Sequence, residues 1–186
     1  MTGNNLTRAE AAERARLLSI GSYTVEWDLT TGDTEFASTT LVTFACTEPG
    51  ASTFIELIAG SVSSIELNGQ ALDPASIIDD GRVRLDGLLA ENELRVVARC
   101  TYSRSGEGLH RFVDPVDKEP YVYSQFEPAD AKRAYATFDQ PDLKATFSFA
   151  ITAPAHWEVV SNEPAGAAEP VGPGVARWAF GTTPRM

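Results

Sequence analysis

Apolar and polar residues alternate along most of the chain, which is the pattern of strands with one buried and one solvated face. In segment 23–29, apolar side chains hold the odd positions, and Thr, Glu and Asp hold the even ones. Apolar runs between turn signals predict further strands at 36–44, 53–58, 62–67, 82–85, 93–102, 121–126, 145–151, 157–160 and 175–180. Short strands separated by turn signals every 8–12 residues indicate an all-β fold, an antiparallel β-sandwich or a saddle of sheets.

A short helix is predicted before the first strand, over about residues 7–19. Thr7 and Glu10 have the spacing of a capping box, with Leu6 and Ala11 placed as a hydrophobic staple. Glu10 and Arg14 have the spacing of a favourable i,i+4 ion pair. The apolar side of the helix is thin, so we expect the helix to lie on the β-structure and not to form a bundle.

The connections are marked by turn residues. Asn68-Gly69 between two β-runs predicts a hairpin with a type I′ turn. Segment 103–120 is expected to be a long connection, 128–135 a short helix with Pro at its first position, and 163–174 a loop. There is no internal repeat, and we expect residues 1–186 to form one domain with a helical prefix.

The charge balance limits the kinds of partner. The chain has 15 Lys and Arg against 26 Asp and Glu, a net charge of −11. This argues against a nucleic-acid or anionic-membrane surface, either of which needs a basic face. The acidity suits a cationic ligand or serves solubility alone. We find no apolar signal region and no apolar stretch approaching 18 residues, so we expect no membrane segment and a cytoplasmic location.

Cysteine and histidine offer little metal or nucleophile chemistry. Cys46 and Cys100 form no C-x-x-C pair and are expected in the core, with one long-range disulfide as the alternative. His110 and His156 belong to no H-E-x-x-H motif, and the chain has no phosphate-binding loop and no G-x-S-x-G elbow. We expect His156 at a turn or the surface, whereas His110 fits either packing or an interface.

One strand carries an unusual polar run. Tyr123, Gln125 and Glu127 alternate onto one face of the strand predicted at 121–126. A carboxylate beside an amide can pair with an ammonium group, so this face could bind a ligand with a positive charge. The alternative is a solvated strand end at which Glu127 caps the helix that starts at Pro128. Three further carboxylates follow within this region: Asp130, Asp139 and Asp142.

The same region resembles a known family. Residues 121–135 read YVYSQFEPADAKRAY, and 138–147 read FDQPDLKATF. They are similar to the signature of the amino-terminal domain of aminopeptidase N, the gluzincin-type zinc metallopeptidases, and most similar to the actinobacterial-type enzymes. Ser124 and Gln140 stand where Thr and Glu are common in the family. Shorter likenesses at 62–69, 157–162 and 180–186 extend the resemblance over nearly the whole chain.

The resemblance implies a saddle-shaped β-domain of a larger zinc aminopeptidase, which removes N-terminal amino acids from peptides. In the family, the H-E-x-x-H zinc helix and the Gly-Ala-Met-Glu-Asn loop lie in a following thermolysin-like domain, and neither occurs here. Zinc is thus implied as the cofactor of the parent enzyme. No metal ligand or catalytic residue is expected in this chain, which alone should be inactive.

The resemblance also implies roles for two residues. Glu127 would bind the free α-amino group of the peptide substrate, and Gln125 would shape the pocket for its first side chain. The expected partners are the peptide N-terminus and the thermolysin-like domain in cis, whose cleft this domain closes on one side. The alternative is a stand-alone β-sandwich module that binds or docks without catalysis.

Overall fold

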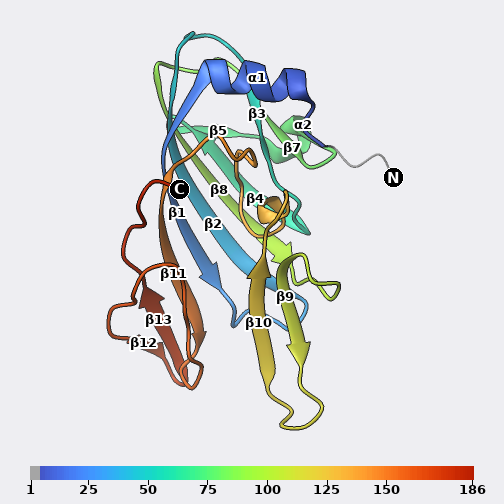
Figure 1. The fold of residues 1–186 in the computed structure, drawn as a ribbon, viewed down its shortest axis with the longest axis vertical. Coiled ribbons are helices and arrows are strands. Elements are labelled where there is room, and N and C mark those ends of the chain that lie inside the picture. Colours follow the sequence, from blue (N-terminus) through green and yellow to red (C-terminus); the bar gives the residue numbers. More distant parts are fainter. Residues whose placement is uncertain (1–4) are drawn as a thin grey trace.

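A computed structural model describes residues 5–186 and shows three sheets and two short α-helices (Figure 1). The largest sheet has eight strands in the order β12-β13-β11-β1-β2-β8-β4-β5. Neighbouring strands in it run antiparallel, except β1 and β11, which pair in parallel. Its strands are β1 (Leu18–Asp28), β2 (Glu35–Cys46), β4 (Ser61–Leu67), β5 (Gln70–Leu72), β8 (Glu91–Thr101), β11 (Thr146–Pro154), β12 (Glu169–Gly172) and β13 (Val175–Ala179).

Two smaller sheets complete the fold. A three-stranded sheet orders β3 (Thr53–Glu56), β7 (Arg82–Leu85) and β6 (Ile78–Asp79). A two-stranded sheet pairs β9 (Gly108–Val113) with β10 (Pro120–Gln125), and this hairpin extends away from helix α1 (Figure 1). The predicted β-rich fold with one main N-terminal helix is confirmed, and the parallel β1–β11 pair is the departure from a purely antiparallel arrangement.

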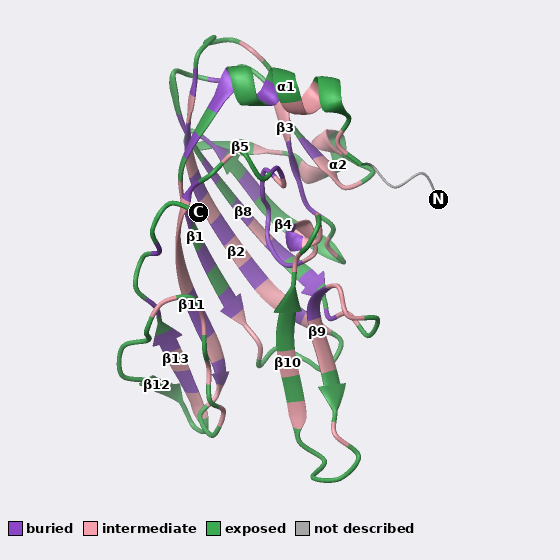
Figure 2. Ribbon diagram, in the orientation of Figure 1, coloured by how far each residue is buried: buried purple, intermediate pink, exposed green. Residues whose placement is uncertain are grey.

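The core lies on one face of the large sheet. Strand β2 shows why, since every second residue from Phe36 to Cys46 is buried while the others are partly exposed (Figure 2). The irregular segment 134–138 lies against this face and is buried with it. Its backbone bonds to side chains of the sheet: the Ala134 carbonyl accepts from Trp27 and Ser38, and the Phe138 amide donates to the Tyr23 hydroxyl.

Helix α1 (Arg8–Leu17) begins as the sequence predicts. The Thr7 hydroxyl accepts from the Glu10 amide at 3.2 Å, and the Glu10 carboxylate accepts from the Thr7 amide at 2.8 Å, which completes the capping box. The predicted ion pair between Glu10 and Arg14 is wrong, because the Glu10 carboxylate pairs with Arg82 Nη1 at 2.6 Å. Arg14 turns instead into the interior, as described below.

The Asn68-Gly69 hairpin is confirmed. It joins β4 to β5, and both residues have positive φ, 54° and 79°, as a type I′ turn requires. Helix α2 (Pro74–Ile77) and strand β6, which follow β5 in the chain, were not predicted from the sequence.

Four expectations are wrong. The connection 103–120 contains β9, and the loop 163–174 contains β12. Segment 157–160 is irregular and not a strand. The helix predicted at 128–135 is a turn followed by the 3-10 helix η1 (Ala131–Arg133). No longer helix forms, because the Ala134 carbonyl accepts from Trp27 and Ser38, and the amides of residues 136–138 bond to Thr40, Glu56 and Tyr23.

Among residues 5–186, no helix is both long and apolar enough to cross a lipid bilayer.

Candidate functional site

Strand β10 carries the polar run and ends just before Glu127. Tyr123 and Gln125 are exposed on it, and Glu127 begins the turn that follows. The Glu127 amide donates to Oε1 of Gln125 at 3.3 Å, so the two residues form one local unit. The Glu127–Pro128 peptide bond is cis. In the described part of the chain, no hydrogen bond or ion pair engages the exposed Glu127 carboxylate.

The capping alternative for Glu127 is wrong. The turn is closed by the Asp130 amide, which donates to the Phe126 carbonyl at 2.9 Å, and helix η1 begins only at Ala131. Asp130 occupies the cap position, and its carboxylate pairs with Arg133 Nε at 2.8 Å. Glu127 therefore caps no helix, and its carboxylate is exposed at the end of the strand.

The other carboxylates of this region lie in different environments. Asp142 is at the surface, and Asp130 is held by Arg133. Asp139 is partly buried, and burial raises the pKa of its carboxyl, with a further raising effect from Glu56. The Lys132 amide donates to Asp139 at 3.4 Å and opposes this rise in pKa. The acidic residues of the sequence therefore do not form a single cluster.

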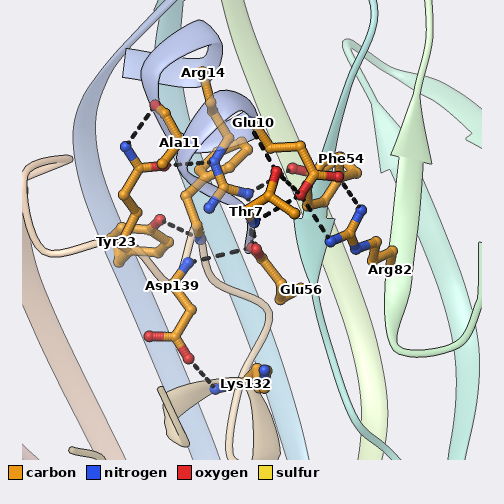
Figure 3. A network of polar contacts seen from close by, with 12 residues as sticks. Thr7, Glu10, Ala11, Arg14, Tyr23, Phe54, Glu56, Arg82, Lys132 and Asp139 are labelled. Atoms are coloured by element: carbon orange, nitrogen blue, oxygen red, sulfur yellow. Dashed lines mark hydrogen bonds and ion pairs between the residues drawn. The ribbon is translucent and has the colours of Figure 1, made fainter. Parts of the chain in front are cut away.

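A buried polar network, which sequence analysis missed, links helix α1 to this region (Figure 3). The side chains of Arg14 and Glu56 are 2% and 5% exposed, and Arg14 Nη1 lies 2.9 Å from both Glu56 carboxylate oxygens. Arg14 Nε also donates to Gln140 Oε1 at 3.0 Å. Glu56 accepts from the Asp139 amide at 3.3 Å. One charged pair thus ties three distant chain segments together.

Aromatic rings surround this pair. The Arg14 guanidinium lies 4.9 Å from the Phe54 ring centroid and 5.6 Å from that of Phe138. Arg82 stacks on Phe54 as well, at 4.1 Å. The inward position of Arg14 could have been predicted from its spacing in the sequence. Arg14 lies three residues from both Ala11 and Leu17, which places all three on the inner side of the helix.

An open pocket of about 450 Å³ borders the turn. The turn contributes Pro128, Ala129 and Asp130, helix η1 adds Lys132 and Arg133, and the rest comes mainly from segments 56–59 and 78–81. Gln125 and Glu127 are not among its lining residues. The pocket is therefore next to the predicted anchor and is not built around it.

The cysteines and histidines lie in different environments in the part of the chain described. Cys46 and Cys100 are both free and buried, which confirms the core interpretation. His156 lies at an exposed turn, as predicted. His110 lies on β9, where its ring stacks near Tyr123 with centroids 4.9 Å apart. Within residues 5–186, no group of three or more His, Cys, Asp or Glu side chains is arranged to hold a metal ion.

Comparison with known proteins defines the class. Residues 90–186 match the model of the peptidase M1 N-terminal domain. The whole chain is 50% identical to an aminopeptidase N of Streptomyces lividans, and the match covers 22% of that protein. Over 57% of the chain, it is 35% identical to a probable M1 family aminopeptidase of Encephalitozoon cuniculi. Over 45% of the chain, it is 31% identical to the aminopeptidase M1 of Arabidopsis thaliana.

The chain belongs to the peptidase M1 N-terminal domain family. The family and the actinobacterial likeness inferred from the sequence are thereby confirmed. The chain spans about a fifth of the length of the Streptomyces relative, and the matched part of the Encephalitozoon protein is 15% of that protein. Most of the polypeptide in these relatives therefore lies outside the region that this chain matches.

Proposed function

We propose that residues 1–186 form the N-terminal domain of a zinc aminopeptidase and that Glu127 anchors the free α-amino group of its peptide substrate. Membership of the M1 family supports the class of enzyme. The observation that carries the residue assignment is the exposed Glu127 carboxylate, without a partner in the described chain and fixed beside Gln125 at the end of β10.

The physical role of Glu127 would be to position the substrate. An exopeptidase must measure the distance between the amino terminus and the bond that it cleaves. A carboxylate at a fixed place does this by pairing with the ammonium group, which supplies orientation without any proton transfer. Gln125 offers an amide next to this carboxylate, and we assign it to the pocket for the first side chain.

Residues 5–186 bring together no cluster of metal-ligating side chains. The zinc of the parent enzyme would be held by its catalytic domain, which we propose to be thermolysin-like and in cis. We also propose a cytoplasmic location, with which two free, buried thiols are compatible.

The decisive test replaces Glu127 by Gln in the full-length enzyme. Loss of a partly desolvated ammonium–carboxylate pair costs about 2–5 kcal/mol, so kcat/KM for a free-amine substrate should fall by roughly 30-fold to several thousand-fold. Melting temperature and zinc content should not change. Glu169→Gln is the matched control, because Glu169 is also an exposed glutamate but lies on the distant edge strand β12.

A Glu127→Gln enzyme within threefold of the parent would show that Glu127 is not the anchor. The alternative function, a stand-alone docking module, makes a different prediction about the gene. It requires an open reading frame that lacks an H-E-x-x-H helix after residue 186, whereas the proposed aminopeptidase requires one.

A further inference from the structure

The turn that carries Glu127 is packed on the domain at one end only. Phe126, at its start, packs on the core. Pro128 and Ala129, in its middle, border the open pocket of about 450 Å³. The turn is closed by the bond from the Asp130 amide to the Phe126 carbonyl at 2.9 Å. The far end of the turn, at Asp130, therefore needs a support of its own.

Arg133 provides a support for Asp130. Its Nε donates to Asp130 Oδ1 at 2.8 Å, and its backbone amide donates to the Asp130 carbonyl at 3.1 Å. The residues on either side of Arg133 are fixed to the rest of the domain. The Lys132 carbonyl accepts from the Ile58 amide at 2.7 Å, and the Ala134 carbonyl accepts from two side chains of the large sheet. Arg133 thus connects a firmly held backbone to the end of the turn.

The stem of Arg133 also lies against the strand pair that leads into the turn. Gly108 of β9 lies directly across from Gln125 of β10. It is buried, with a φ of 70°, and a Cβ added to it would lie 2.9 Å from Cβ of Arg133. This spacing leaves no room for a side chain, so the backbone opposite Gln125 packs directly on the arginine stem. Arg133 therefore contacts both structures that place Gln125 and Glu127, namely the strand pair and the turn.

We propose that Arg133 is a positioning residue of the substrate anchor, which holds the Glu127 carboxylate in place through its contacts with Asp130 and Gly108. The inference rests on the proposed function, because it takes Glu127 to bind the substrate ammonium. An anchor that measures distance must itself stay in place, since a displacement of about 1 Å can lower a rate by about 100-fold. In this role Arg133 touches neither the substrate nor the reacting atoms.

A double-mutant cycle in the full-length enzyme tests the proposal. Arg133→Met keeps the packing of the stem on Gly108 and removes the Nε donor, and Asp130→Ala removes the acceptor of the same pair. Each variant should lower kcat/KM for a free-amine substrate by roughly 10-fold to 100-fold. In the Glu127→Gln background, Arg133→Met should change kcat/KM by less than about threefold, because the effects of residues that act as one unit do not add.

Arg84→Met is the matched control. Arg84 Nε also pairs with an aspartate, Asp86, at 2.8 Å, but Arg84 lies on β7 of the three-stranded sheet. Its kcat/KM should stay within about threefold of the parent. The Arg133 and Asp130 side chains are 39% and 21% exposed, and pairs exposed to this extent contribute little to folding. Zinc content and Tm of Arg133→Met should therefore match those of the control.

Three results would overturn the role of Arg133 and leave the Glu127 anchor in place. The first is a kcat/KM of Arg133→Met within threefold of the parent. The second is an equal loss with and without the Glu127 carboxylate, and the third is a loss accompanied by a lower zinc content or Tm than in the control. A Glu127→Gln enzyme within threefold of the parent would instead reject the proposed function, and the positioning role with it.

Discussion

Replacing Arg14 by Met tests the buried network, because it removes one member of a charged pair and leaves the other in place. The Glu56 side chain, 5% exposed, would keep only the Asp139 amide as a donor. Breaking a buried ion pair in this way costs about 3–5 kcal/mol. For a domain of this size, each kcal/mol lowers the melting temperature by about 2–4 °C, so Tm should fall by roughly 6–20 °C.

The double variant Arg14→Met/Glu56→Leu gives the sharper result. It leaves no buried charge behind, and its main losses are the acceptor of the Asp139 amide and the donor to Gln140, each about 1 kcal/mol. We therefore expect the double variant to lie within about 2 kcal/mol of the parent and to be more stable than Arg14→Met alone.

Urea unfolding of the 186-residue chain, followed by circular dichroism, measures these free energies of unfolding. Arg16→Met is the matched control on the same helix. Arg16 also pairs with two carboxylates, those of Glu13 and Glu48, but it is 51% exposed, so its loss should cost less than about 1 kcal/mol. A double variant that is less stable than Arg14→Met, or a loss below 1 kcal/mol for Arg14→Met, would refute the reasoning.

Three further predictions follow from the same chain. The purified 186-residue chain should bind no stoichiometric zinc and should cleave no aminoacyl reporter substrate. Elemental analysis that finds one tightly bound zinc per chain would contradict this prediction. Hydrogen bonding to Arg82 lowers the pKa of Glu10 to about 2. The difference in stability between the parent and Glu10→Gln should therefore be constant above about pH 4.3 and vanish as the pH falls through 2. Melting curves in which this difference persists at pH 2 would exclude the pairing of Glu10 with Arg82. Burial raises the pKa of Asp139, so its ionised form is disfavoured in the folded state and stability falls as the pH rises above its unfolded value near 3.9. Asp139→Asn should therefore raise Tm at pH 7 and not at pH 3.5, and an equal change at both pH values would show that charge is not the cause.

The elements that could be predicted are those whose pattern is local. The capping box at Thr7 and the turn at Asn68-Gly69 each need only neighbouring residues, and both occur as expected. The alternation in β2 and β8 was equally clear, because one face of each strand meets the core and the other does not. Local rules suffice where the surroundings only reinforce them.

The failures at the segment after Pro128, at β9 and at Arg14 arise where distant partners decide the outcome or where the local alternation is missing. The segment after Pro128 has helix-compatible residues, but its backbone bonds to Tyr23, Thr40 and Glu56 of other strands. Strand β9 was hidden because its outward face carries His110 and Phe112, so the apolar–polar alternation is missing. The ion-pair partner of Arg14 could not be inferred from the sequence, because Glu56 lies 42 residues away in the chain.

The strength of ion pairs decides where the proposed Glu127 anchor can work. An ammonium that pairs with an exposed carboxylate in water gains only about 0–1 kcal/mol, too little to fix a substrate. Glu127 is exposed in this domain. Its carboxylate becomes an effective anchor only where another protein surface excludes water, because the same pair is then worth about 2–5 kcal/mol. We propose that the catalytic domain in cis supplies that surface, so Glu127 should be an effective anchor only in the full-length enzyme.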